Sequence, residues 1–536
     1  MGGFVFLNKK RKLKYLRSIW GKYIEKYRNL DLIASYHNLL KEKEKNNYVD
    51  DKTWDDLNFD SIFSKIDRNI SGIGQQFLYH SLHKYENDTD ILRKKFDTIS
   101  VLKTDRELRE KIQMNLFRIS NITSYFIPHL LLDKSIPYAK FYPLFYLCSF
   151  VSLVSLLLIP FEGIFLFIAI GILLTNLILN KIFSNKIYKY FAGFSGLNSL
   201  IISAISLCKI RTNNDIRELK SLQQKNGLLN SLKKKLGYFV IDKESLNELA
   251  VVIIEYLNLF LLFDIIAYYR SVNTLLKHQD EIHTVYQDVA KLDIYISIAS
   301  YLEETGTFSN PEFNETGIIG FDNLYHPLIN DAVPNTLNNL KNSALITGSN
   351  MAGKTTFIKT IGINFILSQT FYFCLAVRLT IPKYIVKAAI KREENLVDGK
   401  SYFFTEIEQL KHFIELSEED HKYLFLIDEI FRGTNTIERL ASSTAVLKYL
   451  DMKNRVLVTT HDIELQESLD DNFKMYHFSE QVENDKYFFN YKIQEGPCSS
   501  GNAVKLLEIM NYPASVTKEA KMIVEKLSQN NDNKRK

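Results

Sequence analysis

The stretch GSNMAGKTT, Gly348–Thr356, decides the fold of the C-terminal part of this 536-residue chain. It fits the pattern G-x-x-x-x-G-K-[ST], in which a glycine-rich loop presents backbone N–H groups to phosphate. The apolar segment SALIT, Ser343–Thr347, predicts a buried strand before the loop, and TTFIKTIGINFIL, which begins at Thr355, predicts a helix after it. Strand, loop and helix in this order favour an α/β nucleotide-binding fold over a chance glycine-rich turn.

Each residue type in this loop has a chemical reason to be there. Gly348 and Gly353 allow the backbone to bend, so that N–H groups and the helix N-terminus face an anion. Lys354 is expected to reach the β and γ phosphates, and the Thr355 hydroxyl is expected to ligate Mg²⁺. We therefore predict ATP and Mg²⁺ as ligands. The other loop residues expected to line the nucleotide are Ser349, Asn350, Met351, Ala352 and Thr356.

A second predicted strand supplies the acidic half of the site. YLFLIDE, Tyr423–Glu429, is an apolar run that ends in two carboxylates. The carboxyl edge of a parallel strand is where α/β sheets bind ligands. Asp428 is the expected Mg²⁺ partner, and Glu429 is the expected base that orients the attacking water. Alone, an acidic pair after a strand also fits an ordinary turn, but the upstream loop favours the catalytic interpretation.

A third predicted strand, RVLVTT at Arg455–Thr460, ends just before His461. A histidine past such a strand can contact the γ phosphate or the attacking water, because an imidazole donates or accepts a proton near neutral pH. A lone histidine is more often a bystander, but this position favours a role. We predict Lys354, Glu429 and His461 as the catalytic residues.

Four motifs in this order and spacing resemble the ATPase domain of the MutS family: TGSNMAGKTTFIKT, GKSYFFTEIEQL (Gly399–Leu410), LIDEIFRGTNT (Leu426–Thr436) and TTHDIEL (Thr459–Leu465). YHPLI upstream agrees, and SSGNAVKLLEIMNYPASVTKEA (Ser499–Ala520) resembles the family's terminal helix-turn-helix, which locks two subunits together. The resemblance is continuous over residues 317–527. It implies an ABC-like P-loop ATPase fold, hydrolysis of ATP with Mg²⁺, and a homodimer through the ATPase domain.

Carried over residue by residue, the resemblance implies that Ser401, in GKSYFF, reaches across the dimer interface to the partner's γ phosphate. Asn350 and Met351 match the N-M of the family's loop. Ala352 and Thr355 stand where the family usually has Gly and Ser, and both keep a small or hydroxylated side chain there.

Other positions depart from the family's pattern. Phe431 stands where the family commonly has Gly, which puts local packing in question rather than the ATPase chemistry. Phe59–Leu102 resembles the start of the family's helical core, although Gly74–Leu78 lacks the arginine of the usual G-x-R-x-L. Leu292–Tyr301 resembles the last core helix before the ATPase domain. The F-x-E letters at Phe313–Glu315 lie in the linker and are attributed to chance.

The chain also contains two uncharged runs, Phe141–Phe161 and Gly163–Asn180, separated only by Glu162. Each is long enough to cross a hydrocarbon core of about 30 Å as a helix. The flanking basic residues are Lys134, Lys140, Lys181, Lys186 and Lys189. Two spans return the chain to its starting side, and positive flanks place both ends in the cytoplasm. We predict a transmembrane hairpin in the inner (cytoplasmic) membrane, with the ATPase domain in the cytoplasm.

A buried helical hairpin in a soluble core is the alternative, because Thr175 and Asn176 dilute the second run. A third apolar stretch, residues 251–266, carries Glu255 and Asp264, which favours a core helix over another span.

Composition sets limits without naming a function. The 67 basic and 62 acidic residues leave a formal charge of +5, so charge alone does not predict nucleic-acid binding. Four scattered cysteines without C-x-x-C spacing indicate neither a metal site nor a disulfide framework.

The expected organisation is an all-α helical core with an inserted transmembrane hairpin, followed by an α/β P-loop ATPase domain. The expected parts are an N-terminal helical segment (1–58), the two parts of the core (59–135 and 190–310), the hairpin (141–180), and the ATPase domain with its C-terminal helix-turn-helix (317–536).

Three functions stay open at this level. The first is a membrane-tethered MutS-like ATPase, related to DNA mismatch repair, whose dimer closes on ATP and acts on double-stranded DNA or on a DNA-bound partner. The second is an ATPase that energises a membrane process, and the third is a nucleotide-gated scaffold in which hydrolysis resets assembly. Mismatch readers of the family use a large N-terminal domain with a Phe-x-Glu wedge. The segment before Phe59 is too short for it, so recognition by that route is not expected.

Overall fold

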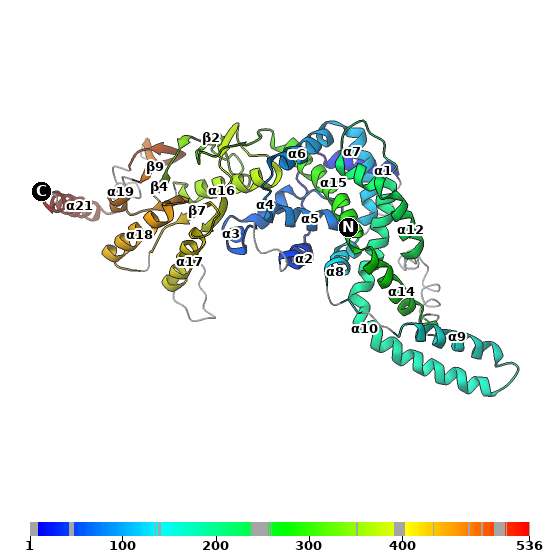
Figure 1. Cartoon of the computed structure of the whole chain (residues 1–536). Helices are drawn as coiled ribbons and strands as arrows, with labels where there is room; N and C mark the ends of the chain where they lie inside the picture. The colour runs from blue at the N-terminus through cyan, green and yellow to red at the C-terminus, as the bar shows by residue number, and fades with distance from the viewer. Residues whose placement is uncertain are drawn as a thin grey trace. The chain divides into compact units, whose positions relative to one another are not determined.

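A helical N-terminal region is followed by mixed α/β sheets, as expected from the sequence. The computed structural model describes residues 9–41, 48–133, 136–137, 141–236, 256, 258, 260–349, 352–390, 402–431, 434–469, 472–483, 486–497, 507, 510 and 512–534. Contacts divide the chain into two units (Figure 1). The helical unit comprises Met1–Asn46, Phe63–Ser81 and Lys94–Gly306, and the α/β unit comprises Asn47–Ile62, Leu82–Arg93 and Thr307–Lys536.

The first helices are α1 (Lys9–Ile19), α2 (Leu30–Lys41), α3 (Asp51–Asp56), α4 (Phe59–Ile66), α5 (Gly72–His83), α6 (Thr89–Thr104), α7 (Arg106–Leu116), the 3₁₀ turns η2 (Phe117–Ile119) and η3 (Ile122–Phe126), and α8 (Ile127–Leu132). The later ones of the helical unit are α9 (Pro143–Leu158), α10 (Ile164–Leu207), α11 (Arg217–Gln224), α12 (Asn226–Leu236), α14 (Phe263–Lys277) and α15 (Gln279–Thr305). Residues 47–62 and 82–93 group with the α/β unit although they lie early in the sequence, and the predicted domain boundaries stay predictions.

The N-terminal segment, predicted to be helical, is divided in two. Helix α1 ends at Ile19 and α2 begins at Leu30. Between them Gly21 has a φ of +67°, a conformation that glycine adopts without strain and that does not continue a right-handed helix.

The core of the helical unit contains buried charges. Asp67 accepts hydrogen bonds or ion pairs from Lys26 Nζ (2.9 Å), Arg28 Nε (2.8 Å) and Gln75 Nε2 (2.7 Å). Burial raises the pKa of the Asp67 carboxyl, but the charges of Lys26 and Arg28 outweigh burial and hold the pKa below its ordinary value. Asp67 is therefore ionised and paired at neutral pH.

A second buried carboxylate, Asp293 on α15, behaves in the opposite way. It accepts hydrogen bonds from the Ser71 hydroxyl (2.5 Å), the Ser71 N–H (2.8 Å) and the Ile70 N–H (3.2 Å). Burial raises the pKa of Asp293 to about 6, because these neutral donors compensate only part of the desolvation.

Helices α9 and α10 form an antiparallel hairpin within the helical unit (Figure 1). The turn between them contains Pro160 and Gly163, where the sequence predicts one. Helix α10 continues far beyond the hairpin and packs on η3 and α8. A Cβ at Gly193 would lie 2.8 Å from Phe126 O, and one at Gly196 would lie 2.8 Å from the Thr123 carbonyl carbon. Only glycine permits this close approach.

The α/β unit contains two sheets. Its strands are β1 (Glu312–Phe313), β2 (Ile319–Leu324), β3 (Asn335–Leu340), β4 (Ser343–Thr347), β5 (Arg378–Ile381), β6 (Ile385–Ala389), β7 (Tyr423–Asp428), β8 (Arg455–Thr460), β9 (Phe473–Glu483) and β10 (Lys486–Glu495). Its later helices are α16 (Lys354–Phe371), α17 (Tyr402–Ser417), α18 (Thr436–Asp451), α19 (Glu464–Leu469) and α21 (Ala514–Lys534). The larger sheet has the order β10-β9-β4-β8-β7-β6, and the smaller one β1-β5-β2-β3.

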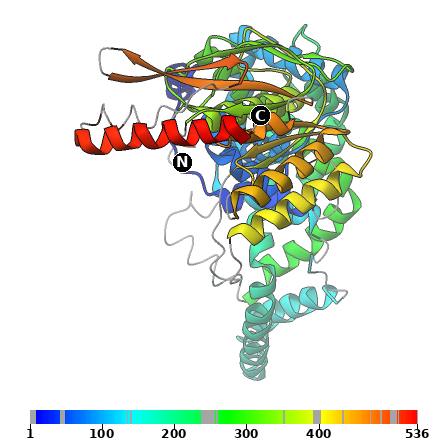
Figure 2. The same ribbon diagram turned by 90° about the vertical axis from the view of Figure 1, so that its left-hand side faces the viewer.

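Helices cover both faces of the larger sheet, which is parallel from β9 to β6. Alternate residues of β7 point to opposite faces. Phe425 and Ile427 join the cluster formed with α17, α18 and α19, whereas Leu426 meets α16 at Gly362. Helices α17 and α18 run side by side on their face (Figure 2). Half of the residues of the helix-turn-helix predicted over Ser499–Ala520 lie outside the described residues, and α21 begins at Ala514 within the other half.

Candidate nucleotide-binding site

Three neighbouring strands bring the predicted site residues to one edge of the sheet. Strands β4 and β7 flank β8, and all three are parallel. Thr347 at the end of β4 is in register with Thr460 of β8, and Asp428 at the end of β7 is in register with Thr459. The loop after Thr347, the carboxylates after β7 and the histidine after β8 therefore emerge together, at the edge where α/β sheets bind ligands.

The loop backbone depends on its two glycines. Gly348 has a φ of +135° and Gly353 a φ of +101°, both in the region that favours glycine. A Cβ at Gly348 would lie 2.6 Å from Phe478 O on β9. Ala352 is buried, and its N–H donates to Ser349 O at 3.2 Å. Asn350 and Met351, predicted to line the nucleotide, lie outside the described residues.

Lys354 begins α16 and turns back over the loop. Its Nζ donates to Gly348 O (2.5 Å) and Ser349 O (2.9 Å) and lies 3.2 Å from His461 Nε2. The ammonium group is thus buried beside the loop whose N–H groups are expected to bind phosphate, where a cation attracts an anion most strongly.

Thr355 and Asp428, the two predicted Mg²⁺ ligands, lie in direct contact. The Thr355 hydroxyl donates to Asp428 Oδ2 at 2.8 Å, and the Thr459 hydroxyl donates to Asp428 Oδ1. A hydroxyl and a carboxylate oxygen at this spacing are hard oxygen ligands of the type that Mg²⁺ prefers. Thr356, also predicted, follows them in the first turn of α16.

Glu429 and His461 face each other across β7 and β8. Glu429 Oε1 lies 3.0 Å from His461 Nε2, and the Glu429 N–H donates to Thr459 O at 2.9 Å. Glu429 has a φ of +62°, an unusual conformation for a side chain other than glycine and one that clusters at functional sites. A proton on His461 Nε2 lets the ring donate to Glu429, whereas a bare Nε2 accepts from Lys354.

Phe431, where the resemblance expects glycine, is buried. It has a φ of +55°, the conformation for which glycine is suited. Its N–H donates to Glu406 Oε1, and its ring packs against Phe403 within the cluster under α17. The hydrogen bond and the packing of the ring offset the backbone strain.

Sequence reasoning missed several supporting side chains. Thr459 holds the second oxygen of Asp428, and Gln466 Nε2 donates to Thr347 Oγ1 at 3.0 Å. Arg439 of α18 forms a bidentate pair with Asp462 at 2.8 and 2.9 Å, which anchors the residue after His461. The position of Thr459 just before the predicted histidine was a usable signal. The Arg439–Asp462 pair depends on tertiary packing and had none.

The site fits a nucleotide phosphate on independent grounds. Ser349 Oγ is buried, and among the described residues it has no hydrogen-bond partner. Buried hydroxyls are normally satisfied, so this atom is available to a ligand held by the loop.

The region that contains this site is similar to known proteins. The model of MutS domain V matches residues 344–528. A DNA mismatch repair protein MutS of Geobacillus sp. (strain WCH70) is 30% identical over 260 residues, which cover 46% of this chain and 30% of that protein. A DNA mismatch repair protein MutS of Thermus thermophilus is 29% identical over 241 residues, which cover 44% of this chain and 29% of that protein.

The match to MutS domain V and the MutS relatives at about 30% identity over nearly half of the chain support membership of the MutS family. The matched part spans less than a third of the length of either curated relative, at 30% and 29%. Ser401, for which the family resemblance implies a role in trans, lies outside the described residues and stays a prediction.

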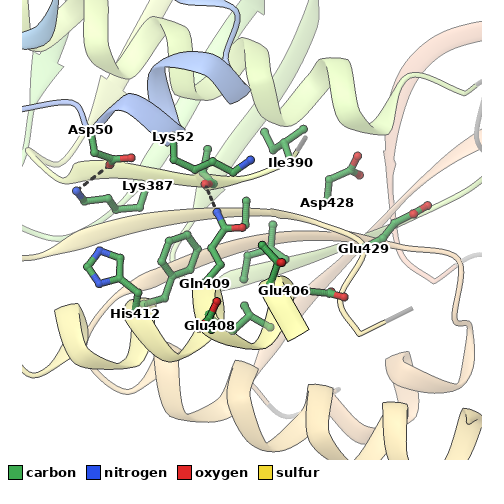
Figure 3. Close-up of a pocket in the computed structure, with 16 residues that line it drawn as sticks. Asp50, Lys52, Lys387, Ile390, Glu406, Glu408, Gln409, His412, Asp428 and Glu429 are labelled. Carbon is green, nitrogen blue, oxygen red and sulfur yellow. Dashed lines mark hydrogen bonds and ion pairs between the residues drawn. The ribbon is translucent and has the colours of Figure 1, made fainter. Parts of the chain in front are cut away.

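A pocket of about 310 Å³ adjoins the carboxylates of Asp428 and Glu429 (Figure 3). Asp428 and Glu429 lie at one end of it, and Asp50 and Lys387 form an ion pair at the other. Residues of α17 supply the wall between them, among them Glu406, Glu408, Gln409 and His412.

Proposed function

We propose that this chain is a MutS-type ATPase that binds MgATP at the edge of its larger sheet and hydrolyses it. The contact that carries the proposal is Thr355 Oγ1 on Asp428 Oδ2 at 2.8 Å, because a helix N-terminal hydroxyl and a strand-end carboxylate meet there. Glu429 and His461 lie next to this pair, at 3.0 Å from each other. Positioned donors and acceptors of this kind account for most of the catalysis of phosphoryl transfer.

Each side chain then has a task. Mg²⁺, when bound, would supply positive charge that offsets the charge of the phosphates. Thr355 and Asp428 would hold it, and Lys354 supplies positive charge to the terminal phosphates. Glu429 accepts a proton from the attacking water, and His461 orients that carboxylate or the water through Nε2.

The proposed active form is a homodimer. The resemblance implies that Ser401 of each subunit reaches the partner's nucleotide, so that neither site would be complete alone. Mixing Ser401→Ala subunits with Lys354→Ala subunits should restore about one working site per mixed dimer, whereas each variant alone should be inactive. Mixed dimers that are confirmed to form but show no turnover would contradict the arrangement in trans.

We further propose that the α9–α10 hairpin anchors the protein in the inner membrane, with the ATPase domain in the cytoplasm. The support is an inverted burial pattern: the buried side chains of the hairpin include Cys148, Ser152, Ser155 and Asn176. The exposed ones include Phe141, Leu147, Phe150, Leu157, Phe161, Ile164, Phe167, Leu174 and Ile178. Large apolar groups outside and small or polar groups between helices are typical of membrane helices.

Lengths give partial support to this anchor. Among the described residues, two parts of α10 are long and apolar enough to cross a membrane, Ile164–Phe183 and Tyr190–Leu207, and the second is mostly buried. Helix α9 is shorter, with 16 residues that span about 24 Å. A bilayer tolerates such a mismatch by thinning or by adjustment of the flanking residues.

Lys354→Ala and Glu429→Gln together test the ATPase. Lys354→Ala should abolish turnover and weaken nucleotide binding, because it removes the charge that faces the phosphates. Glu429→Gln should keep the affinity for MgATP and slow hydrolysis by about 100-fold or more. Nucleotide affinity and steady-state rate are measured on the full-length protein in detergent, with the exposed Lys422→Ala as a matched control. An equal loss of affinity in the Glu429 variant would show that its role is binding.

A second candidate function is a membrane-anchored, nucleotide-gated scaffold that does not bind DNA, and the membrane-type hairpin is what favours it. Binding of the full-length dimer to duplex DNA, titrated with salt, separates the two. Direct phosphate contacts make the affinity fall steeply as salt rises. Duplex binding with such a salt dependence supports a DNA-acting ATPase, and its absence at low salt supports the scaffold.

A further inference from the structure

The outer strand of the larger sheet, β6, is closed by side chains instead of another strand. β6 pairs with β7 on one side. On its other side the alternate N–H groups of Val386, Ala388 and Ile390 need acceptors, since buried backbone N–H groups are nearly always paired. Those acceptors come from residues about 300 positions earlier in the sequence.

Three side chains supply these acceptors, and we call them the edge clamp: Tyr85, Thr53 and Asp56. Tyr85 Oη accepts from Val386 N at 3.2 Å, Thr53 Oγ1 from Ala388 N at 3.1 Å, and Asp56 Oδ2 from Ile390 N at 2.7 Å. All three residues are buried.

Further contacts fix the orientation of the edge clamp. The Thr53 hydroxyl gives its own proton to Asp50 Oδ2 at 2.8 Å, and Asp50 Oδ2 pairs with Lys387 Nζ at 2.9 Å. Burial raises the pKa of Asp50, but the charge of Lys387 and the hydrogen bonds from Lys387 and Thr53 outweigh it and leave the pKa below its ordinary value. Asp50 is therefore an ionised acceptor that holds the Thr53 hydroxyl in one direction.

Residues 48–60, which contain Thr53 and Asp56 of the edge clamp, also contact α16, the helix that follows the phosphate loop. Leu57 packs on Gly362 of α16, where a Cβ would lie 3.2 Å from the Leu57 methyl carbons. Asn58 Oδ1 accepts from Lys359 Nζ at 2.8 Å. Residues 48–60 thus touch both β6 and the helix that begins with Lys354.

The edge clamp also holds the strand that forms one wall of the pocket beside Asp428 and Glu429. Lys387 and Ala388 of β6 and Ile390, which follows it, line that pocket, and Asp428 and Glu429 lie at its other end (Figure 3). A shift of β6 would change the distance between this wall and the two carboxylates.

We propose that Thr53, Asp56 and Tyr85 are positioning residues for ATP hydrolysis, which hold β6 in place so that the pocket keeps its shape against Asp428 and Glu429. The proposal rests on the proposed ATPase function. The nucleotide itself is expected to bind at the loop and α16, so the edge clamp acts on turnover more than on affinity. An ATPase site built from residues 348–461 therefore depends on side chains near the start of the chain.

The test compares Thr53→Val with Thr53→Ser in the full-length protein in detergent. Valine keeps the shape of threonine but leaves Ala388 N–H without its acceptor, whereas serine keeps the hydroxyl. For each protein kcat and KM for MgATP are measured, together with the affinity for a fluorescent ATP analogue and the thermal unfolding midpoint. Thr53→Val should lower kcat per folded molecule by about tenfold with an affinity close to that of the wild type, and Thr53→Ser should restore kcat.

Tyr85→Phe is the second variant, because it removes one acceptor, keeps the ring and remains informative if Thr53→Val does not fold. A lower kcat with unchanged affinity in Tyr85→Phe supports the proposal. A kcat per folded molecule equal to that of the wild type in the variants that fold, even with a lower unfolding midpoint, would mean that these residues are structural only. Absence of ATP turnover in the wild type would overturn the ATPase function itself, and the positioning role with it.

Discussion

The two halves of helix α10 have similar apolar composition and opposite surroundings. Both Ile164–Phe183 and Tyr190–Leu207 are long and apolar enough to cross a bilayer. Yet 11% of the first is buried in the protein, against 67% of the second. Apolar length therefore does not distinguish a lipid-facing helix from a core helix, and what surrounds each half does.

Close packing separates the halves. The buried half has Gly193 and Gly196, where the backbone of η3 and side chains of α8 come within reach of an added methyl group. In the exposed half Gly171 has nothing within 4 Å of an added Cβ. Asn176 is the buried polar residue of that half, and its Nδ2 donates to Phe260 O at 2.6 Å.

Deletion of Phe141–Asn180 should have the largest effect, because it removes the exposed half and leaves the buried half. The full-length protein is expected to sediment with membranes and resist carbonate extraction, and the deletion variant should be soluble and retain ATP turnover. The apolar surface that the folded hairpin exposes would hold the intact protein in lipid if the proposed anchor is right. Membrane fractionation and a turnover assay measure both outcomes.

Topology gives the control for that deletion. A reporter at Glu162 should lie outside the cytoplasm, and reporters at residues 130 and 190 should lie inside. Release of the intact chain by carbonate, or cytoplasmic labelling at Glu162, would favour the soluble hairpin.

A pair of glycine substitutions should give the next largest effect. Gly196→Leu forces a side chain into the backbone at Thr123 and should lower the free energy of unfolding by about 3 kcal/mol or more. Gly171→Leu meets open space and should be neutral or slightly stabilising, since leucine favours helix over glycine by up to about 1 kcal/mol. Thermal unfolding in detergent measures the stability of both variants. Similar losses in the two variants would mean that both halves are packed alike.

The core around the buried half contains an ionisable group that titrates, and Asp293→Asn tests it. The folded pKa of about 6 lies above the ordinary value of 3.8, so the folded state binds more protons between these values. Stability from this group is full below about pH 4 and is lost as pH rises through 6, about 3 kcal/mol in all. Asp293→Asn should remove that slope, as followed by unfolding midpoints from pH 4 to 7.

Asp67→Asn is the control of opposite sign for that titration. Its paired carboxylate has a lowered pKa, so its stabilisation is present at neutral pH and is lost as pH falls. The gap between wild type and Asp67→Asn should therefore shrink toward acid pH, whereas the gap for Asp293→Asn should change in the other direction. The same sign for both would contradict the assigned environments.

Asn176→Leu should have the smallest effect. It removes the hydrogen bonds from Asn176 Nδ2 to Phe260 O and, at 3.4 Å, to Ser152 Oγ, and bonds of this kind between membrane helices contribute about 1 kcal/mol or less each. The loss should not depend on pH, because an amide does not titrate. Thr175→Leu is the matched control, since Thr175 is exposed and its hydroxyl donates within its own helix, to Gly171 O. A larger loss of stability in Thr175→Leu than in Asn176→Leu would show that the assigned lipid-facing side of the helix is wrong.

Sequence predicted the parts of the fold that depend on local patterns. The strands Ser343–Thr347 and Arg455–Thr460 have the predicted bounds, because each is an apolar run that stops at a functional loop. Residues 48–62 were missed as part of the α/β unit. Their contacts with β6 join positions more than 300 apart, and no local periodicity reports such pairing.

Sequence motifs predicted the individual residues of the candidate site, but not the side chains that support them. The structure brings Lys354, Thr355, Asp428, Glu429 and His461 together, as their positions at strand ends imply. It does not describe Asn350, Met351 or Ser401. The support from Thr459 follows from the register of β7 and β8, and strand order is set by tertiary packing that single motifs do not contain.

Helix α10 runs for 44 residues, about 66 Å, with no proline to hinge it. A rod of this kind passes tilt and twist along its length instead of absorbing them in a loop. Gly193 and Gly196 pack the C-terminal half of α10 closely against the carbonyl groups of Phe126 and Thr123, which restricts movement of that half along its axis. If the other end stands in a bilayer, a change in lipid thickness or lateral pressure acts as a torque on the helical core. In the same way, a motion of the helical core would be transmitted by α10 to the surrounding lipid.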